Sequence, residues 1–168
     1  MPLWQEFDFE CDVMLQDPAR EVKTCIDAGA SRIVVHAGAA SARKALEILQ
    51  ESRGGDFPIE VGVALQAHDT PATLKPYEKL YDYVQVMGID HIGKQGEPPD
   101  PHHRDVKLIR ALRKQFPTLT IQADGAAVAH IGELVNAGVN RLVVGSAILR
   151  AQDPKAAYKA LYTEANAL

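Results

Sequence analysis

Two short segments near the end of the sequence combine residue types that suit phosphate binding. Asp124-Gly125-Ala126 and Gly145-Ser146-Ala147 each directly follow a short apolar run. Glycine lets the backbone approach a ligand closely, and backbone N–H groups at such turns can bind phosphate oxygens. The alternative is that these residues only make tight turns. We predict a phosphate site formed by the backbone of Gly125, Ala126, Gly145 and Ser146.

Asp124 is the first candidate for proton transfer. A carboxylate at the end of an apolar strand can act as a general acid or base, or as a metal ligand. It can also cap the helix that follows. His36 ends another apolar run and is open to a similar range of roles: a base, a ligand or a hydrogen-bonded wall residue.

Other polar clusters carry weaker chemical signals. His91, His102 and His103 do not predict a metal site, because adjacent residues of a helix point in different directions. The segment Gly93-Lys94-Gln95-Gly96 can touch an anion, although it lacks the other glycine of a P-loop.

The elements that must position these residues alternate regularly along the chain. Apolar runs predict strands at residues 7–15, 32–36, 59–65, 83–87, 119–123 and 141–144. Periodicity predicts helices at residues 18–28, 41–52, 71–80, 101–115, 128–137 and 154–166. The expected helix caps are Asp17, Ser41 and Asp153. We therefore predict a single domain of six βα units over residues 1–168, with ligands at the C-terminal ends of its strands.

Two α/β architectures accommodate six such units. Runs such as residues 33–35 and 142–144 are apolar on both faces, which is typical of a parallel sheet covered by helices. An open doubly wound sheet needs no further strands, whereas a complete (βα)8 barrel takes about 200 residues or more. Periodicity alone does not choose between the two.

Composition excludes several classes of protein. The chain has 168 residues and a formal net charge of −4, with a pI of about 5.8, which argues against a nucleic-acid binder. No apolar run is long enough to span a membrane, and the first residues do not resemble a secretory signal. Cys11 and Cys25 are expected to be reduced thiols in a cytoplasmic protein.

The order of several short motifs resembles the ribulose-phosphate 3-epimerase family. The motifs are Asp12-Val13-Met14-Leu15, Ala28-Gly29-Ala30, Val35-His36, Gly62-Val63-Ala64-Leu65 with Thr70-Pro71, Val86-Met87, Asp124-Gly125, and Val144-Gly145-Ser146-Ala147-Ile148 followed by Asp153-Pro154. The resemblance extends from about residue 8 to residue 160. Of these motifs, the Asp-Gly and Gly-Ser-Ala-Ile segments at this separation are moderately specific.

The resemblance implies a fold, a reaction and a cofactor. The expected fold is a (βα)8 barrel, incomplete here, because the match begins at the family's third strand and leaves six units. The implied reaction is epimerisation of a ketopentose 5-phosphate by proton transfer through an enediolate, with a divalent metal (Zn, Fe, Mn or Co). Asp124 corresponds to one acid/base and metal ligand, and Gly93 and Gly96 join the expected phosphate-binding residues. Met14 and His36 are expected to contact the substrate.

Met14 departs from the family pattern. The family has a metal-binding histidine at that place, and its two ligands on the second strand, including the other acid/base, have no counterpart in this sequence. Activity of this chain is therefore expected to be weak or absent. An alternative is a remnant that binds a sugar phosphate without turning it over.

A second alternative rests on the segment from Asp12 to Asp17. Ribulose-monophosphate and orotidine-phosphate decarboxylase-like barrels use Asp-x-Lys-x-x-Asp at this strand, and both aspartates are present here. Met14 stands at the lysine position, so the proton donor of that chemistry is missing.

The expected partners are a phosphorylated sugar and a second copy of the chain. Nucleic acid and membranes are not expected. Six strands of an eight-stranded barrel leave the strands at residues 7–15 and 141–144 as edges, and an exposed edge invites pairing with another chain. We therefore expect a homo-oligomer.

Overall fold

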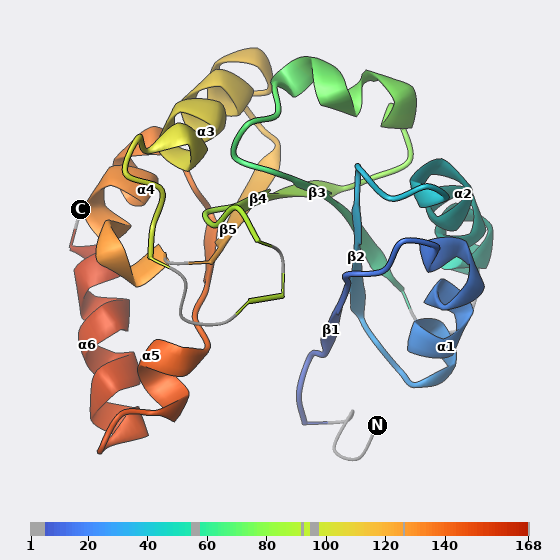
Figure 1. Ribbon diagram of the computed structural model, residues 1–168. Coiled ribbons are helices and arrows are strands. Elements are labelled where there is room, and N and C mark those ends of the chain that lie inside the picture. Colours follow the sequence, from blue (N-terminus) through green and yellow to red (C-terminus); the bar gives the residue numbers. More distant parts are fainter. Residues whose placement is uncertain (1–5, 55–57, 92, 95–97, 126, 168) are drawn as a thin grey trace. The chain divides into compact units, whose positions relative to one another are not determined.

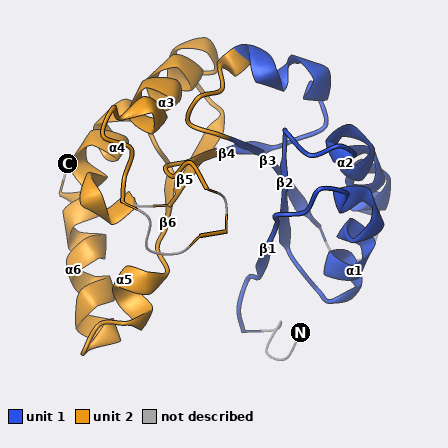
Figure 2. Cartoon of the chain, viewed as in Figure 1, with its two compact units in different colours: residues 1–65, 72–85 blue, residues 66–71, 86–168 orange. Residues whose placement is uncertain are grey.

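A computed structural model describes residues 6–54, 58–91, 93–94, 98–125 and 127–167. They form two compact units (Figure 2). The first contains residues up to 65 together with 72–85, and the second contains 66–71 and 86–168. The prediction of a single domain stays a prediction.

The first unit contains a parallel sheet covered by two helices. Strands β1 (Glu10–Val13), β2 (Arg32–His36) and β3 (Glu60–Leu65) pair in parallel and in sequence order. Helices α1 (Val22–Asp27) and α2 (Ala42–Glu51) lie on one side of this sheet (Figure 1). The alternation of side chains along β2 sends Ile33 and Val35 to one face and Val34 and His36 to the other.

Short 3-10 helices complete the first unit. They are η1 (Pro18–Arg20), η2 (Ser52–Gly54) and η3 (Pro71–Tyr77), and β4 (Tyr83–Met87) follows η3. Val34, Ala64 and Tyr83 form a fully buried cluster. Gly62 allows this packing, because a Cβ there would lie 2.4 Å from Tyr83 Cζ. Only glycine admits the tyrosine ring at this distance.

The second unit continues the same alternation. Its elements are the end of β4, α3 (Arg104–Gln115), β5 (Thr120–Asp124), η4 (Ala127–Ala129), α4 (Ile131–Ala137), β6 (Arg141–Val143), α5 (Ser146–Leu149) and α6 (Pro154–Asn166). Strands β5 and β6 are parallel, with Asp124 opposite Val143. The buried side chains Ile109, Leu112, Ile121 and Leu134 form its core.

Two predicted caps act differently in the structure. The Asp17 side chain accepts no hydrogen bond from a backbone N–H of the helix that follows, and neither does the Ser41 side chain. Instead, Ser41 Oγ donates to the Asp17 carboxylate and accepts a hydrogen bond from Ala19 N at 3.1 Å. In the structure, the helix predicted at residues 18–28 is split into η1 and α1. The third prediction is confirmed, because Asp153 Oδ1 accepts from Ala156 N at 3.0 Å.

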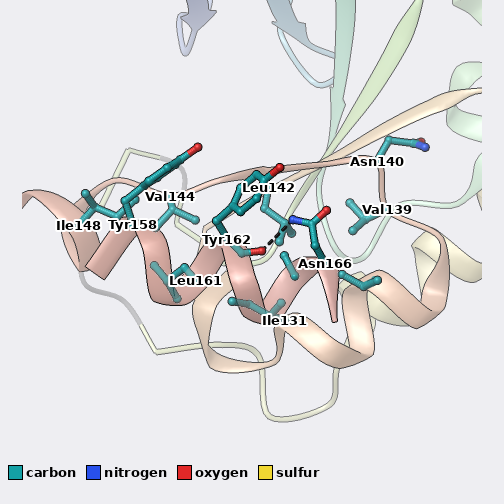
Figure 3. Close-up of a pocket in the computed structure, with 12 residues that line it drawn as sticks. Ile131, Val139, Asn140, Leu142, Val144, Ile148, Tyr158, Leu161, Tyr162 and Asn166 are labelled. Atoms are coloured by element: carbon teal, nitrogen blue, oxygen red, sulfur yellow. Dashed lines mark hydrogen bonds between the residues drawn. The ribbon is translucent and has the colours of Figure 1, made fainter. Parts of the chain in front are cut away.

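A pocket of about 640 Å³, lined mostly by apolar residues, lies beside α6 in the second unit (Figure 3). It is lined by Leu142 and Val144 around β6, by Ile131 of α4, and by Tyr158 and Tyr162 of α6, among others. Asp124, Gly125 and Gly145 do not line it. This pocket is therefore separate from the predicted phosphate site.

Candidate functional site

Asp124 is the last residue of β5, and the turn after it holds its carboxylate. Gly125 N donates to Asp124 Oδ1 at 2.7 Å. Gly125 has a φ of +83°, in the left-handed region that favours glycine. Asp124 is partly exposed. Helix α4 is capped at His130 instead, so the alternative role of Asp124 as the cap of that helix is wrong.

Gly88 links the end of β4 to the Asp124 turn. Gly88 N donates to the backbone oxygen of Asp124 at 2.7 Å. A Cβ built on Gly88 would lie only 2.2 Å from the oxygen of Gly125. Ile89 is buried and packs against Gly125. The two strand ends are therefore held closely together, and glycine is required where they meet.

Gly145 lies at the same edge of the sheet as the Asp124 turn. Because Asp124 is the register partner of Val143, Gly125 and Gly145 both follow the C-terminal ends of paired strands. Gly145 and Ser146 are exposed, and a Cβ on Gly145 would meet no protein atom within 4 Å. The structure thus brings Gly125, Gly145 and Ser146 to one open edge.

The structure describes only some of the remaining residues of the predicted phosphate site. Ala126 and Gly96 lie outside the described residues. Gly93 is exposed, with a φ of +82°. It belongs to the segment between β4 and α3, whose far end is anchored by Asp100. Asp100 Oδ2 accepts hydrogen bonds from Arg104 N and Nε at 2.9 and 2.7 Å.

Arg104 also reaches back to the start of that segment. Its Nη2 donates to both carboxylate oxygens of Asp90, at 3.0 and 2.9 Å. The hydrogen bond from the Arg104 side chain is the main cause that holds the pKa of the Asp100 carboxyl well below its usual range. Both ends of the segment are therefore tied to one guanidinium group.

His36 belongs to a polar cluster in the first unit. His36 Nε2 lies 2.8 Å from Asp12 Oδ1, and Gln85 Nε2 donates to Asp12 Oδ2 at 2.9 Å. His36 is 6% exposed. Its Nδ1 atom is buried and has no hydrogen-bond partner among the described residues. A carboxylate is an acceptor, so the proton of a neutral His36 ring is expected on Nε2, which leaves an unused lone pair on Nδ1.

The cluster was only partly visible in the sequence. His36 was open to three roles, and the structure shows it hydrogen-bonded to a neighbouring strand. In the sequence, Asp12 belongs to the epimerase-like motif at residues 12–15 and to an Asp-x-Lys-x-x-Asp pattern, and neither predicts its contact with His36 or with Gln85. The strand alternation was the available signal, because Asp12 pairs with Val34 and His36 lies two residues further on the same face.

A buried pair of ionisable residues in the second unit was missed entirely. His130 Nε2 lies 2.8 Å from Asp105 Oδ2, and the two side chains are 5% and 4% exposed. The rings of His130 and His103 are 5.2 Å apart, and His103 Nδ1 lies 3.2 Å from Glu133 Oε2. Asp105 and His130 are 25 residues apart in the sequence, and neither belongs to a motif that predicts their contact.

The implied divalent metal does not fit the part of the chain that the structure describes. Within it, His, Cys, Asp and Glu residues form no group of three or more that could hold a metal ion. Met14, where the family pattern implies an imidazole ligand, is 39% exposed just after β1. Its thioether is a soft ligand, unlike the imidazole and carboxylate groups that suit Zn or Mn. We therefore derive no chemical step through a metal.

Comparison with known proteins decides the family. The sequence pattern of the ribulose-phosphate 3 epimerase family matches residues 2–149. The chain belongs to this family. The ribulose-phosphate 3-epimerase of Schizosaccharomyces pombe is 31% identical over 152 residues, which cover 90% of this chain and 64% of that protein. The Mycobacterium leprae enzyme of the same name is 27% identical, over 97% of this chain and 72% of that protein.

This epimerase-family chain covers only part of the length of its relatives. It spans 64%, 59% and 57% of the length of three fungal ribulose-phosphate 3-epimerases, from Schizosaccharomyces pombe, Eremothecium gossypii and Candida glabrata. A rice relative, 29% identical, is named as a cytoplasmic isoform. Among the described residues, the helices are too short or too polar to cross a membrane.

Solved structures with a similar fold confirm the predicted fold class. KGPDC from Streptococcus mutans, solved as a ligand complex, has a TM-score of 0.76 over 98% of this chain and 75% of that one, at 15% identity. A 3-hexulose-6-phosphate synthase has a TM-score of 0.69, over 90% of this chain and 70% of that one, at 23% identity. The fold class is an incomplete (βα)8 barrel that contains six βα units. The doubly wound alternative is wrong.

Proposed function

We propose that this epimerase-family chain binds a ketopentose 5-phosphate, with the phosphate group at the Gly125 and Gly145 turns. The observation that carries the proposal is the register of β5 and β6, which puts both turns at the same strand edge. Gly145 and Ser146 are exposed there, and exposed backbone N–H groups at such turns are suitable donors to phosphate oxygens.

Asp124 is the proton-transfer group in this proposal. Its carboxylate is partly exposed and accepts a hydrogen bond from Gly125 N. A carboxylate beside the phosphate-binding turn is suited to take a proton from the carbon next to the ketone, which gives an enediolate, and to return the proton to that carbon. Inversion requires a second group on the opposite face of the enediolate. We therefore expect proton exchange to exceed epimerisation in this chain.

Other residues have secondary roles in the proposal. Met14 and His36 stay predicted substrate contacts, and Gly93 stays a predicted phosphate contact. The name of the rice relative supports a cytoplasmic location for this chain. The names of the fungal and mycobacterial relatives support a ribulose phosphate as the ligand.

The phosphate part of the proposal is tested by a titration with inorganic phosphate and with ribulose 5-phosphate. Backbone amide shifts of the full chain are measured, and those of Gly125, Gly145 and Ser146 are expected to move with saturation. Gly145→Ala is expected to weaken binding at least tenfold, because the new methyl group would occupy the open space in front of the turn.

Gly38→Ala is the matched control for this titration. Gly38 is exposed and, like Gly145, has no protein atom within 4 Å of a built Cβ, but it lies after β2 in the first unit. Its substitution should leave phosphate affinity unchanged. Shifts elsewhere, with the three named amides silent, would overturn the phosphate site.

A decarboxylase-like reaction is a less supported candidate. The solved structures that share the fold include an orotidine 5'-monophosphate decarboxylase from Sulfolobus solfataricus, with a TM-score of 0.69 at 14% identity over 95% of this chain and 74% of that one. Against this candidate, Met14 occupies the position of the required lysine. Asp17 is engaged by Ser41 Oγ and, at 2.7 Å, by Arg20 Nε. Release of carbon dioxide from orotidine 5'-monophosphate by the chain would favour it over epimerase chemistry.

A further inference from the structure

The buried pair of Asp105 and His130 lies near Gly88, whose amide is hydrogen-bonded to Asp124. Asp105 lies in the first turn of α3, and His130 immediately precedes α4. Their side chains are joined at 2.8 Å and are almost completely buried. Two ionisable groups removed from water are costly unless they are well paired. A pair in this place therefore needs a reason beyond helix packing.

Gly88 connects this pair to the proposed site. A Cβ built on Gly88 would lie 3.3 Å from Asp105 Oδ2 and 2.2 Å from the oxygen of Gly125. The Asp105 carboxylate and the Gly125 carbonyl thus both border the same glycine. Gly88 N, in turn, donates to the backbone oxygen of Asp124. His130 is thus paired with Asp105, Asp105 lies next to Gly88, and Gly88 is hydrogen-bonded to Asp124.

The orientation of Asp105 is fixed from two sides. Its Oδ1 accepts from Val106 N at 2.8 Å, and its Oδ2 faces His130 Nε2 at 2.8 Å. On the outer side, His130 lies against the His103 ring, and His103 lies beside Glu133. A carboxylate with so little freedom keeps a constant position beside Gly88, where an added Cβ would lie 3.3 Å from Asp105 Oδ2.

We propose that Asp105 and His130 are positioning residues, which hold the Gly88–Gly125 backbone contact and so fix the place of the Asp124 carboxylate. They do not touch the substrate. The inference rests on the proposed function for its effect on proton exchange, whereas its effect on the backbone is independent of any substrate. The two can therefore fail separately.

Hydrogen exchange at single amides tests the backbone part. In Asp105→Ala, exchange at Gly88 N is expected to accelerate at least tenfold more than exchange at core amides of the same unit, such as those of Leu112 and Ile121. Asp105→Asn, which keeps the shape and one acceptor, should recover much of this protection. Equal acceleration at Gly88 and at the core amides would mean general destabilisation and would overturn the inference.

Two further variants separate positioning from packing. His130→Gln retains a donor and should resemble Asp105→Asn. Glu133→Gln is the control, because it changes only the exposed end of the cluster and should leave Gly88 protection unchanged. If Asp105→Ala does not fold, His130→Ala takes its place, because it also removes the contact between the two side chains. Protection at Gly88 equal to wild type in that variant would contradict the inference.

The catalytic consequence is measured as a ratio. Asp105→Ala is expected to lower solvent-deuterium exchange into ribulose 5-phosphate by about tenfold while changing the dissociation constant of inorganic phosphate less than threefold, and Asp105→Asn should lose less of this exchange. If deuterium exchange into the substrate and phosphate affinity fell by the same factor, the proposal that Asp105 positions Asp124 would be overturned. If the wild-type chain introduces no deuterium into ribulose 5-phosphate, the proposed function fails. Hydrogen exchange at the Gly88 amide still tests the Gly88–Gly125 backbone contact.

Discussion

His36 and Asp12 are joined across two neighbouring parallel strands, with His36 Nε2 lying 2.8 Å from Asp12 Oδ1. The other oxygen of Asp12 accepts from Gln85. One carboxylate therefore takes hydrogen bonds from side chains of two strands, β2 and β4. This arrangement makes Asp12 the residue on which the polar cluster of the first unit depends.

Asp12→Asn should destabilise the chain by about 1–3 kcal/mol, because an amide cannot accept from both His36 and Gln85 without presenting a donor to one of them. Denaturant unfolding measures the loss, and ring nitrogen shifts of His36 should report a change at Nε2. Asp8→Asn is the control, since Asp8 is 74% exposed, and it should change stability by less than about 0.5 kcal/mol. Equal stability of the two variants would show that the cluster contributes nothing.

Gly88 and Gly145 should respond oppositely to alanine. Gly88→Ala puts a methyl group 2.2 Å from the oxygen of Gly125, and such overpacking against backbone should cost about 3 kcal/mol or more. Gly145→Ala meets no neighbouring atom and should stay within about 0.5 kcal/mol of wild type. Thermal or denaturant unfolding of both variants checks this, and a tolerated Gly88→Ala would contradict the close approach.

The raised pKa of the Cys25 thiol predicts a loss of folding stability at alkaline pH. Burial, together with the neighbouring Cys11 thiol, raises the pKa of Cys25 from 9.0 to about 11. The folded chain therefore holds this proton more tightly than the unfolded chain. The resulting contribution is fully present below about pH 9 and is lost as the pH rises toward 11.

The Cys25 prediction is checked by comparing the pH dependence of unfolding in wild type and Cys25→Ser. The difference between them should change between about pH 9 and 11 and be constant at lower pH, because tyrosine and lysine titrations are common to both. A constant difference over the whole range would contradict the raised pKa. Both thiols are free in the structure, as predicted.

The order of the strands predicts self-association. Strands β1 and β6 stand first and last in the order of the described sheet, and β6 with the helices after it carries exposed apolar side chains, including Val143, Leu149, Tyr158 and Tyr162. Exposed edges and apolar surface both favour pairing with another chain. We expect a homo-oligomer in sedimentation at micromolar concentration. A monomer of 18.3 kDa that stays monomeric on concentration would contradict this.

Local sequence patterns predicted most of the strands and fewer of the helix boundaries. The strands at residues 32–36 and 83–87 agree with β2 and β4, because β-branched apolar runs between polar turns leave little choice. The predicted helix at residues 71–80 is the 3-10 helix η3, which contains Pro76. Proline removes a backbone donor and disfavours a regular α-helix there. Helix α5 was missed, since its four residues are too few to show periodicity.

The candidate site was predictable where it depends on strand ends and not where it depends on packing between helices. Asp124 ends a strand, Gly125 and Gly145 come after strand ends, and parallel strands bring their C-terminal ends to one edge. The contact of Asp105 with His130 depends instead on how α3 packs against α4, which no local pattern encodes. The close approach of Gly88 to Gly125 is likewise a tertiary contact that no local sequence pattern predicts.

Solvent-deuterium exchange into ribulose 5-phosphate is the most direct test of the proposed chemistry. The full chain is expected to introduce deuterium at the carbon next to the ketone faster than buffer alone, with formation of the epimer much slower than exchange. Asp124→Asn should abolish the exchange while phosphate still shifts the Gly145 amide. Exchange that survives in Asp124→Asn, or epimerisation at about 10 s⁻¹, a typical enzyme turnover, would contradict the assignment of Asp124 as the single proton-transfer group.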